Sequence, residues 1–160
     1  SQLMAKTKAS RDRNASFPFE IPYRLINMYS AEGDTVLDPF AGLGTTNIAC
    51  MISNRNSIGI DIDPEIVKLA IENMGITTEA ANAIIDSRIK RHLEFIAALP
   101  DEKKAKCYDN GPHGIRVKTK QETAIEIEQL KSIERTESGY ECYYEKYKPI
   151  QRPEQMSLVL

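Results

Sequence analysis

The stretch Asp38-Pro39-Phe40-Ala41-Gly42-Leu43-Gly44-Thr45-Thr46 decides the fold expected for this chain. Its two glycines stand where a short apolar run ends and a helix-forming run begins. A backbone that turns there, close to a polar or anionic ligand, leaves no room for a Cβ atom. The stretch is therefore predicted to be a ligand-binding loop that joins a strand to a helix.

The segments around this loop predict alternating strands and helices. Residues 35–37 form a short apolar run typical of a buried parallel strand, and residues 57–61 form a second one. Residues 45–52 contain no helix breaker. After the second strand, Asp63 is placed to cap a helix with Pro64 at its first position. This order predicts a βαβ unit with parallel strands.

The flanking sequence divides the chain into three parts. Residues 1–16 are polar and are expected to be a flexible or ligand-ordered arm, and residues 17–100 a single α/β unit. Within that unit, one helix is expected from about Pro22 to Gly33 and another over residues 78–99. Residues 101–160 form an extension. There, residues 101–106 are expected to be a charged break, residues 114–118 a short strand, and residues 124–133 and 140–147 an antiparallel hairpin.

Composition excludes several classes of protein. At 160 residues the chain can form one domain with a core. Its net charge of −2 argues against a surface that is basic throughout. No apolar run approaches the roughly 20 residues that span a bilayer, and no secretory signal is evident, so no membrane partner and a cytoplasmic location are expected.

Cysteine and histidine usage does not favour a metal site or a disulfide framework. Cys50, Cys107 and Cys142 are far apart and odd in number, and His92 and His113 stand alone. The cysteines are expected to be small buried or half-buried hydrophobic residues, and no metal ligand is predicted.

The acidic residues around the loop favour one cofactor. Asp61 follows Asp38 by 23 residues, the place from which an acid grips the hydroxyls of a ribose. Asn47 occupies the position of the third glycine of a nicotinamide-binding loop, and no lysine-containing phosphate loop is present. A carboxylate before the glycines repels a pyrophosphate but suits an ammonium group. S-adenosylmethionine (SAM) is therefore favoured over NAD.

Two motifs resemble those of a known family. The loop 38–46, followed by Ile58-Gly59-Ile60-Asp61-Ile62-Asp63-Pro64-Glu65, closely resembles DNA amino-methyltransferases, which modify the exocyclic amine of adenine or cytosine. The stretch Asn14-Ala15-Ser16-Phe17-Pro18, with Ile21-Pro22 and Leu25-Ile26, resembles the segment before the cofactor strand in the permuted (beta-type) subgroup. The resemblance covers about residues 13–75. It implies a Rossmann-like SAM-methyltransferase fold: a partial parallel sheet with flanking helices, here followed by the carboxyl-terminal antiparallel hairpin.

The resemblance also implies roles for individual residues. Asp61 would hold the ribose, Ile62 would flank the adenine, and the amino-terminal arm would close the pocket. The implied cofactor-binding residues are Asn14, Ser16, Phe17, Asp38, Pro39, Phe40, Gly42, Gly44, Thr45, Asp61 and Ile62. Several have simpler alternatives. Phe40 and Ile62 are equally compatible with a place in the core. Ser16 is better explained as an ordinary loop residue, and Asp63 as a helix cap.

The catalytic motif of the family is absent from this sequence. Such enzymes resemble one another in a polar residue followed by Pro-Pro and an aromatic residue, which holds the target amine and stacks on the extruded base. No Pro-Pro occurs here, so no catalytic residue is predicted. The chain is expected to be the SAM-binding part of such an enzyme, reaching DNA through a complementary catalytic or target-recognition segment or subunit. A non-catalytic partner subunit, an RNA methyltransferase and an oligomer remain alternatives.

The tyrosines of the expected hairpin allow two interpretations. Tyr140, Tyr143, Tyr144 and Tyr147 could stack on bases, but alternating Tyr and Glu is more typical of an ordinary half-buried strand. An exposed edge in this region could also pair with another chain.

Overall fold

The computed structural model describes residues 17–148, which form two compact units. The first unit contains residues 17–82 and 130–144, and the second contains residues 83–129 and 145–148. The boundary between these two units falls inside a long helix, α5 (Thr78–Ala97). The expected arm, residues 1–16, lies outside the described residues.

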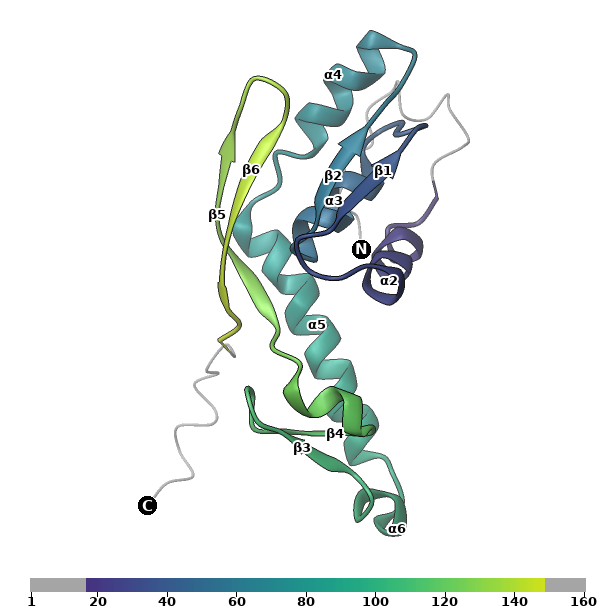
Figure 1. Cartoon of the computed structure of the whole chain (residues 1–160), viewed down its shortest axis with the longest axis vertical. Coiled ribbons are helices and arrows are strands. Elements are labelled where there is room, and N and C mark those ends of the chain that lie inside the picture. The colour runs from purple at the N-terminus through teal and green to yellow at the C-terminus, as the bar shows by residue number, and fades with distance from the viewer. Residues whose placement is uncertain (1–16, 149–160) are drawn as a thin grey trace. The chain divides into compact units, whose positions relative to one another are not determined.

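The first unit contains the expected βαβ arrangement. Its elements are α2 (Glu20–Tyr29), β1 (Thr35–Asp38), α3 (Thr45–Ile52), β2 (Asn56–Gly59) and α4 (Pro64–Asn73), shown in Figure 1. Strands β1 and β2 are parallel, with Leu37 opposite Ile58. The predicted α/β class, with a small parallel sheet and flanking helices, is therefore confirmed.

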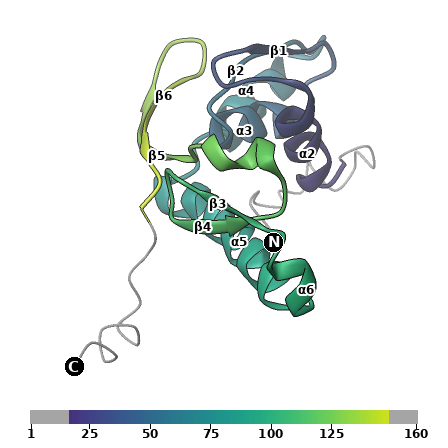
Figure 2. The same cartoon turned by 60° about the horizontal axis from the view of Figure 1, so that its bottom comes forward.

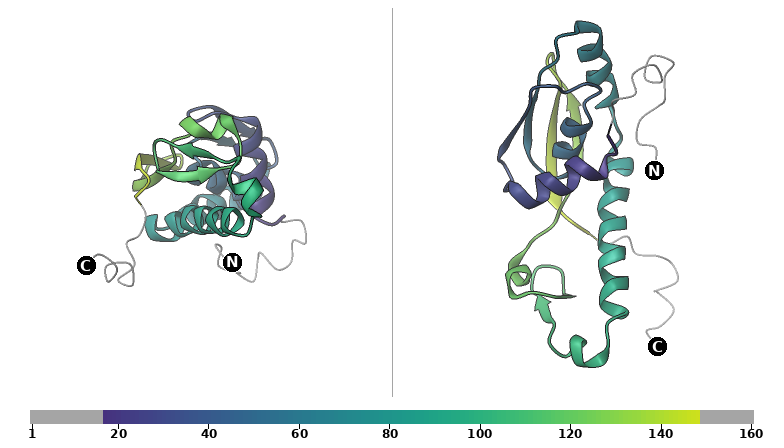
Figure 3. Two further views of the ribbon diagram at one scale, coloured as in Figure 1. Left: turned by 90° about the horizontal axis from the view of Figure 1, so that it is seen from below. Right: turned by 90° about the vertical axis from the view of Figure 1, so that its right-hand side faces the viewer.

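Helix α3 is the centre of this unit. Its residues Ile48, Ala49 and Cys50 are almost completely buried. Helix α2 packs against α3 (Figure 3), and the buried residues of α2 include Tyr23 and Ile26. Burial raises the pKa of the Cys50 thiol to about 11, so this cysteine acts as a small hydrophobic residue, as expected.

One expectation about the strands is wrong. The sequence predicted that both strands would be buried, but Leu37 is 59% exposed and Ile58 is 53% exposed. The reason is that α3 covers one face of the two-stranded sheet, while no described element covers the face that carries Leu37 and Ile58. The apolar run therefore marks a surface that this chain leaves open.

A hairpin of β5 (Glu128–Arg135) and β6 (Tyr140–Lys146) follows, as predicted, but its first strand begins later than expected. The sequence placed that strand at residues 124–133. Residues 120–124 instead form a 3-10 helix, η1 (Lys120–Ala124), because Thr119 and Glu122 form a capping box. Within the first unit, the Tyr144 hydroxyl of β6 donates a hydrogen bond to the Met51 carbonyl oxygen at 2.7 Å.

The second unit contains the larger part of α5, a short helix α6 (Asp101–Lys104) and the antiparallel strands β3 (Tyr108–Asn110) and β4 (Ile115–Val117), shown in Figure 2. Strand β4 was predicted, whereas α6 and β3 were not. Buried Asn110 donates hydrogen bonds to the carbonyl oxygens of Glu122 and Ile125 at 2.7 and 2.8 Å and so holds the hairpin to η1.

Two aromatic rings complete the packing of the second unit. The Nε2 atom of His113 accepts a hydrogen bond from the Ile127 N–H at 2.7 Å, and burial lowers the pKa of this histidine. The Tyr147 hydroxyl donates to Asp86 at 2.7 Å. Tyr147 is thus a buried structural residue, which agrees with the ordinary-strand interpretation of this tyrosine.

None of the helices in the described part of the chain is long and apolar enough to cross a membrane.

Candidate cofactor site

The glycine loop has the backbone conformation that its sequence predicted. Gly42 and Gly44 have φ angles of +53° and +79°, in the left-handed region that side chains disfavour. Gly44 is also the N-cap of α3, and a Cβ atom on it would lie 3.3 Å from the Cβ atom of Ala70 in α4. The close approach at this glycine is therefore to a neighbouring helix of the same unit.

Asp61 connects the loop to the end of β2. Its Oδ2 atom accepts a hydrogen bond from the Gly42 N–H at 3.1 Å, and its Oδ1 atom accepts one from the Asp63 N–H at 3.0 Å. Each carboxylate oxygen has a second lone pair, so both remain able to accept a hydrogen bond from a ribose hydroxyl. Sequence reasoning missed this structural role, although both strands of a βαβ unit end at the same edge of the sheet.

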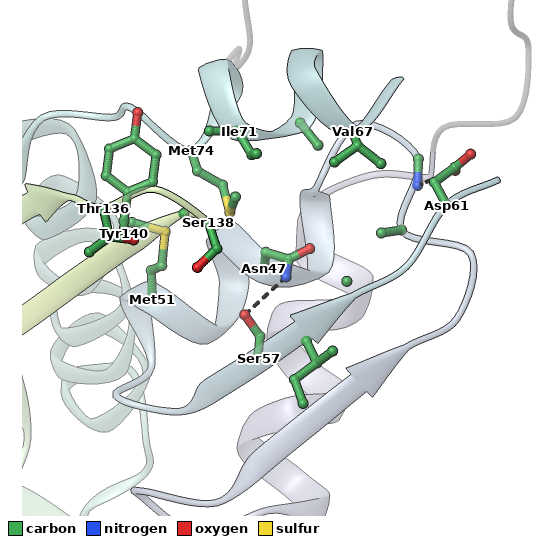
Figure 4. A pocket seen from close by; sticks show the side chains of 16 residues that line it. Asn47, Met51, Ser57, Asp61, Val67, Ile71, Met74, Thr136, Ser138 and Tyr140 are labelled. Carbon is green, nitrogen blue, oxygen red and sulfur yellow. Dashed lines mark hydrogen bonds between the residues drawn. The ribbon is translucent and has the colours of Figure 1, made fainter. Parts of the chain in front are cut away.

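Asn47 and Gly59 determine how closely α3 approaches β2. The Asn47 amide is buried and donates a hydrogen bond to the Ser57 hydroxyl at 3.0 Å (Figure 4). A Cβ atom on Gly59 would lie 2.8 Å from the Asn47 Oδ1 atom. In nicotinamide-binding loops the third glycine of the helix allows this close contact. In this chain the glycine that allows the close contact is Gly59 on strand β2, and the helix position carries Asn47.

A cavity of about 420 Å³ borders the loop within the first unit (Figure 4). Asp61 lies at one end of it, where it binds the Gly42 N–H, and Asn47 and Ser57 lie on one wall. The remaining walls come from α3, α4 and the turn of the β5–β6 hairpin, and their side chains include Met51, Val67, Ile71, Met74, Thr136, Ser138 and Tyr140. The contribution of the hairpin turn was not predicted, because nothing in residues 136–140 resembles a ligand-binding motif.

Several predicted site residues in the described part of the chain do not line this cavity. Asp38 is partly exposed, and its Oδ1 atom accepts a hydrogen bond from the Phe40 N–H at 3.1 Å. Phe40 is 86% exposed and Ile62 fully exposed, so the alternative that placed them in the core is wrong. Pro39 and Phe17 are also exposed.

The remaining predicted residues differ in what a ligand could reach. Thr45 is 4% exposed, so almost none of this residue is accessible in the structure. Asp63 caps α4 by accepting a hydrogen bond from the Glu65 N–H at 3.0 Å, as expected. Asn14 and Ser16 lie outside the described residues. Among residues 17–148, no group of three or more acidic, histidine or cysteine side chains could hold a metal ion.

Comparison with known proteins relates the amino-terminal part of the chain to DNA methylases. Residues 2–72 match the family described as "DNA methylase", whose name refers to N6 and N4 methyltransferases. The Type II methyltransferase M.MthZI of Methanothermobacter thermautotrophicus is 39% identical over 143 residues, which are 89% of this chain and 39% of M.MthZI. The Type II methyltransferase M.MjaI of Methanocaldococcus jannaschii is 56% identical over 64 residues, which are 40% of this chain and 21% of M.MjaI.

A solved structure also matches part of the chain. A putative DNA modification methylase from Thermus thermophilus, complexed with SAM, is 45% identical with a TM-score of 0.37, covering 39% of this chain and 26% of that protein. This chain thus spans well under half the length of M.MthZI and of M.MjaI. The expected similarity to DNA amino-methyltransferases is confirmed for the part of the chain that contains the glycine loop and Asp61.

Proposed function

We propose that this chain is the SAM-binding part of a DNA methyltransferase that modifies the exocyclic amine of adenine or cytosine. The observation that carries the proposal is the arrangement of the glycine loop and Asp61, which lies inside the 2–72 match. The methionine carboxylate of SAM needs amide donors, its ammonium needs a carboxylate, and its ribose needs a hydrogen-bond acceptor. The loop, Asp38 and Asp61 provide these three kinds of group at adjacent strand ends.

The backbone of the loop supports binding of the carboxylate. Gly42 and Gly44 turn the chain into the start of α3, where the first amides of a helix have no partner within the helix. We assign the methionine end of the cofactor to this loop, with contacts from Gly42, Gly44 and the Thr45 backbone, and with Asp38 facing the ammonium group.

Two exposed apolar side chains suit the rest of the cofactor. Phe40 and Ile62 project from the ends of β1 and β2 without packing partners in a core. Covering such side chains with a ligand removes apolar surface from water. We therefore assign Ile62 to one face of the adenine and place Phe40 and Pro39 beside the methionine end. In the same proposal, Asn14, Ser16 and Phe17 close the site from the amino-terminal arm.

The chemistry of methyl transfer requires a second polypeptide segment. The chain contains no Pro-Pro sequence, and it matches 39% of M.MthZI. We propose that a complementary catalytic segment, which precedes the cofactor segment in the permuted order, holds the target amine and stacks on the extruded base. DNA is then bound mainly by that segment, and a cytoplasmic location fits this role. A non-catalytic partner subunit is the second candidate, and the missing tetrapeptide is the observation that favours it.

Calorimetric titration of the purified chain with SAM tests the proposal. Asp61→Ala removes the acceptors for the ribose and is expected to weaken binding by about 1–3 kcal/mol, roughly 5- to 150-fold. Asp61→Asn retains one oxygen acceptor and is expected to weaken binding less. Asp101→Asn, an equal change of charge on an exposed residue of α6, serves as the control and should leave the affinity unchanged. Equal affinity of the Asp61 variants and the original chain would remove Asp61 from the site.

A further inference from the structure

The two units of the described chain differ in charge. The first unit, residues 17–82 and 130–144, contains five lysines and arginines against twelve acidic residues, a net charge of −7. The second unit, residues 83–129 and 145–148, contains eleven against nine, a net charge of +2. The net charge of −2 for the whole sequence hides this difference. Electrostatic attraction therefore directs a polyanion to the second unit and away from the first.

The unpaired positive charge of the described chain is concentrated in residues 103–120. Five lysines between residues 17 and 148 are in ion pairs with a carboxylate, namely Lys68, Lys90, Lys104, Lys146 and Lys148. The other five lysines in that range are exposed and form no ion pair with a described carboxylate, namely Lys103, Lys106, Lys118, Lys120 and Lys131. Four of these five thus lie within one stretch of 18 residues in the second unit.

Arg116 of β4 fixes the position of the turn that carries two of these lysines. Its Nη2 atom donates hydrogen bonds to the carbonyl oxygens of Lys104 and Cys107 at 2.9 and 3.0 Å. Within that turn, the Lys106 N–H donates to the Lys103 carbonyl oxygen at 3.2 Å. Two residues three apart in a helical turn have their side chains on the same side, so Lys103 and Lys106 are neighbours.

Contacts with helix α5 position the other two lysines. The Lys118 Nζ atom lies 5.8 Å from the centre of the Phe95 ring, within the range of a cation–π contact. The Nε2–H of His92 donates to the Arg116 carbonyl oxygen at 2.8 Å, which joins α5 to β4. Lys120 follows Lys118 by two residues and begins η1. Helices α5 and α6 and strand β4 are therefore held together within the second unit (Figure 2).

Nearby acidic residues offset only part of this charge. Asp101 and Asp109 are already in ion pairs within the second unit. Glu122 is held by the capping box of η1, where its carboxylate accepts a hydrogen bond from the Thr119 N–H at 2.7 Å. Glu102 of α6 therefore remains against the four unpaired lysines.

We propose that the second unit contacts the phosphate backbone of duplex DNA through one surface. This surface, called the lysine surface, consists of Lys103, Lys106, Lys118 and Lys120. The inference rests on the function proposed above, because DNA is the substrate assigned there. A lysine ammonium is a compact charge that suits a phosphate oxygen.

The lysine surface is expected to supply affinity without sequence preference. Arginine is the residue that most often reads a base edge, through a two-pronged contact with guanine. Here the guanidinium of Arg116 is already occupied by two carbonyl oxygens and Asp109. Contacts to phosphates position a duplex but carry no direct sequence information. Recognition of the target sequence therefore stays with the complementary segment of the enzyme.

Fluorescence anisotropy of the purified chain with a labelled DNA duplex, measured over a range of salt concentrations, tests the proposal. Each phosphate contact contributes about −0.9 to the slope of log K against log salt concentration. Replacing all four lysines of the surface with glutamine is expected to reduce the magnitude of this slope by about 3–4 and to weaken binding at low salt by about tenfold or more. An unchanged slope and affinity would assign DNA binding to another part of the chain and overturn the proposal.

Two further variants control for position and for packing. Lys131→Gln removes an exposed, unpaired lysine of the first unit and should leave both the affinity and the slope unchanged. Replacing the same four lysines with arginine retains the charges and should retain both quantities, which separates the loss of charge from a change in the fold. A Lys131→Gln variant that loses as much affinity as Lys118→Gln contradicts a surface confined to the second unit.

Competition experiments test the choice of partner. Unlabelled DNA duplexes of two unrelated sequences should compete equally, whereas polyglutamate at the same total charge should compete poorly. Polyglutamate that competes as well as DNA overturns the proposal, by showing that any acidic polymer suffices. An RNA duplex that competes better than DNA also overturns it, by assigning the surface to RNA. A preference between the two DNA sequences that disappears in the four-glutamine variant contradicts the role without sequence preference.

The two proposals fail in different ways. If the chain binds SAM but the four-glutamine variant keeps its affinity for DNA, the cofactor role stands and the lysine surface is wrong. If the lysines bind DNA but the chain does not bind SAM, the proposed function is wrong and the surface remains a DNA contact.

Discussion

Gly33 and Gly44 have nearly the same backbone conformation in different surroundings. Their φ angles are +80° and +79°. A Cβ atom on Gly33 would meet nothing within 4 Å, whereas one on Gly44 would lie 3.3 Å from the Ala70 Cβ atom and 3.4 Å from the Ala70 carbonyl oxygen. Substituting alanine at each glycine in turn therefore separates two costs. One is the strain of a left-handed backbone, which both positions have, and the other is the contact between the glycine loop and α4, which only Gly44 has.

Gly44→Ala is expected to lower the free energy of unfolding by more than Gly33→Ala does. Left-handed strain costs each variant about 1–2 kcal/mol, and the Ala70 contact adds to the cost only at Gly44. Urea unfolding of both variants measures the difference. Adding Ala70→Gly to Gly44→Ala should recover part of the loss that is due to the contact. Equal losses in the two single variants would show that α4 tolerates the added methyl group.

At the scale of elements, the contact between α3 and β2 depends on one pair of residues. Asn47 fills the space that Gly59 leaves, and its amide donates to Ser57 across the helix–strand interface. The amide is buried and satisfied, so the asparagine stabilises the interface in place of a helix glycine. This arrangement explains why the loop lacks the third glycine.

Gly59→Ala is expected to destabilise the chain by about 1–3 kcal/mol, because the new methyl group would overlap the Asn47 side chain. Asn47→Ala removes the obstacle, so the double variant should be less destabilised than the sum of the two single variants. A double-mutant cycle in urea measures this coupling, which for residues in contact is about 0.5–3 kcal/mol. Additive effects would mean that Gly59 and Asn47 do not limit the approach of the helix.

At the scale of the whole molecule, cofactor binding and methyl transfer are expected to be separable. The glycine loop, Asp38 and Asp61 all lie in the first unit, whereas the sequence has no Pro-Pro motif to hold a target base. The open apolar face that carries Leu37 and Ile58 is consistent with a unit that functions with further polypeptide packed against it.

The purified chain is expected to bind SAM and to transfer no methyl group to duplex DNA. Incubation with tritiated SAM and mixed-sequence DNA measures transfer directly, and the Escherichia coli DNA adenine methyltransferase YhdJ, which is 40% identical over 55 residues, provides a positive control. Robust labelling of DNA by this chain alone would contradict the division of function proposed above.

Local features of the site were predictable from the sequence because neighbouring residues produce them. The left-handed glycines, the Asp63 cap, the breaker-free helix 45–52 and the parallel order of the strands all follow from residue types at short spacing. The capping box that turns residues 120–124 into a 3-10 helix also has a local sequence signature, but the alternation of the following residues masked it.

Burial and the composition of the cavity depended on the tertiary structure. An apolar strand is buried only if another segment covers it, so residues 35–38 alone could not reveal that Leu37 faces outward. The hydrogen bond between Asp61 and Gly42 needs the crossover of the βαβ unit, and the cavity needs a hairpin turn about 80 residues further along the chain. The sequence by itself determined the backbone conformation of the glycine loop, because this depends on the types of neighbouring residues. Only the tertiary structure decided which surfaces stay open, because long-range packing cannot be read from local residue patterns.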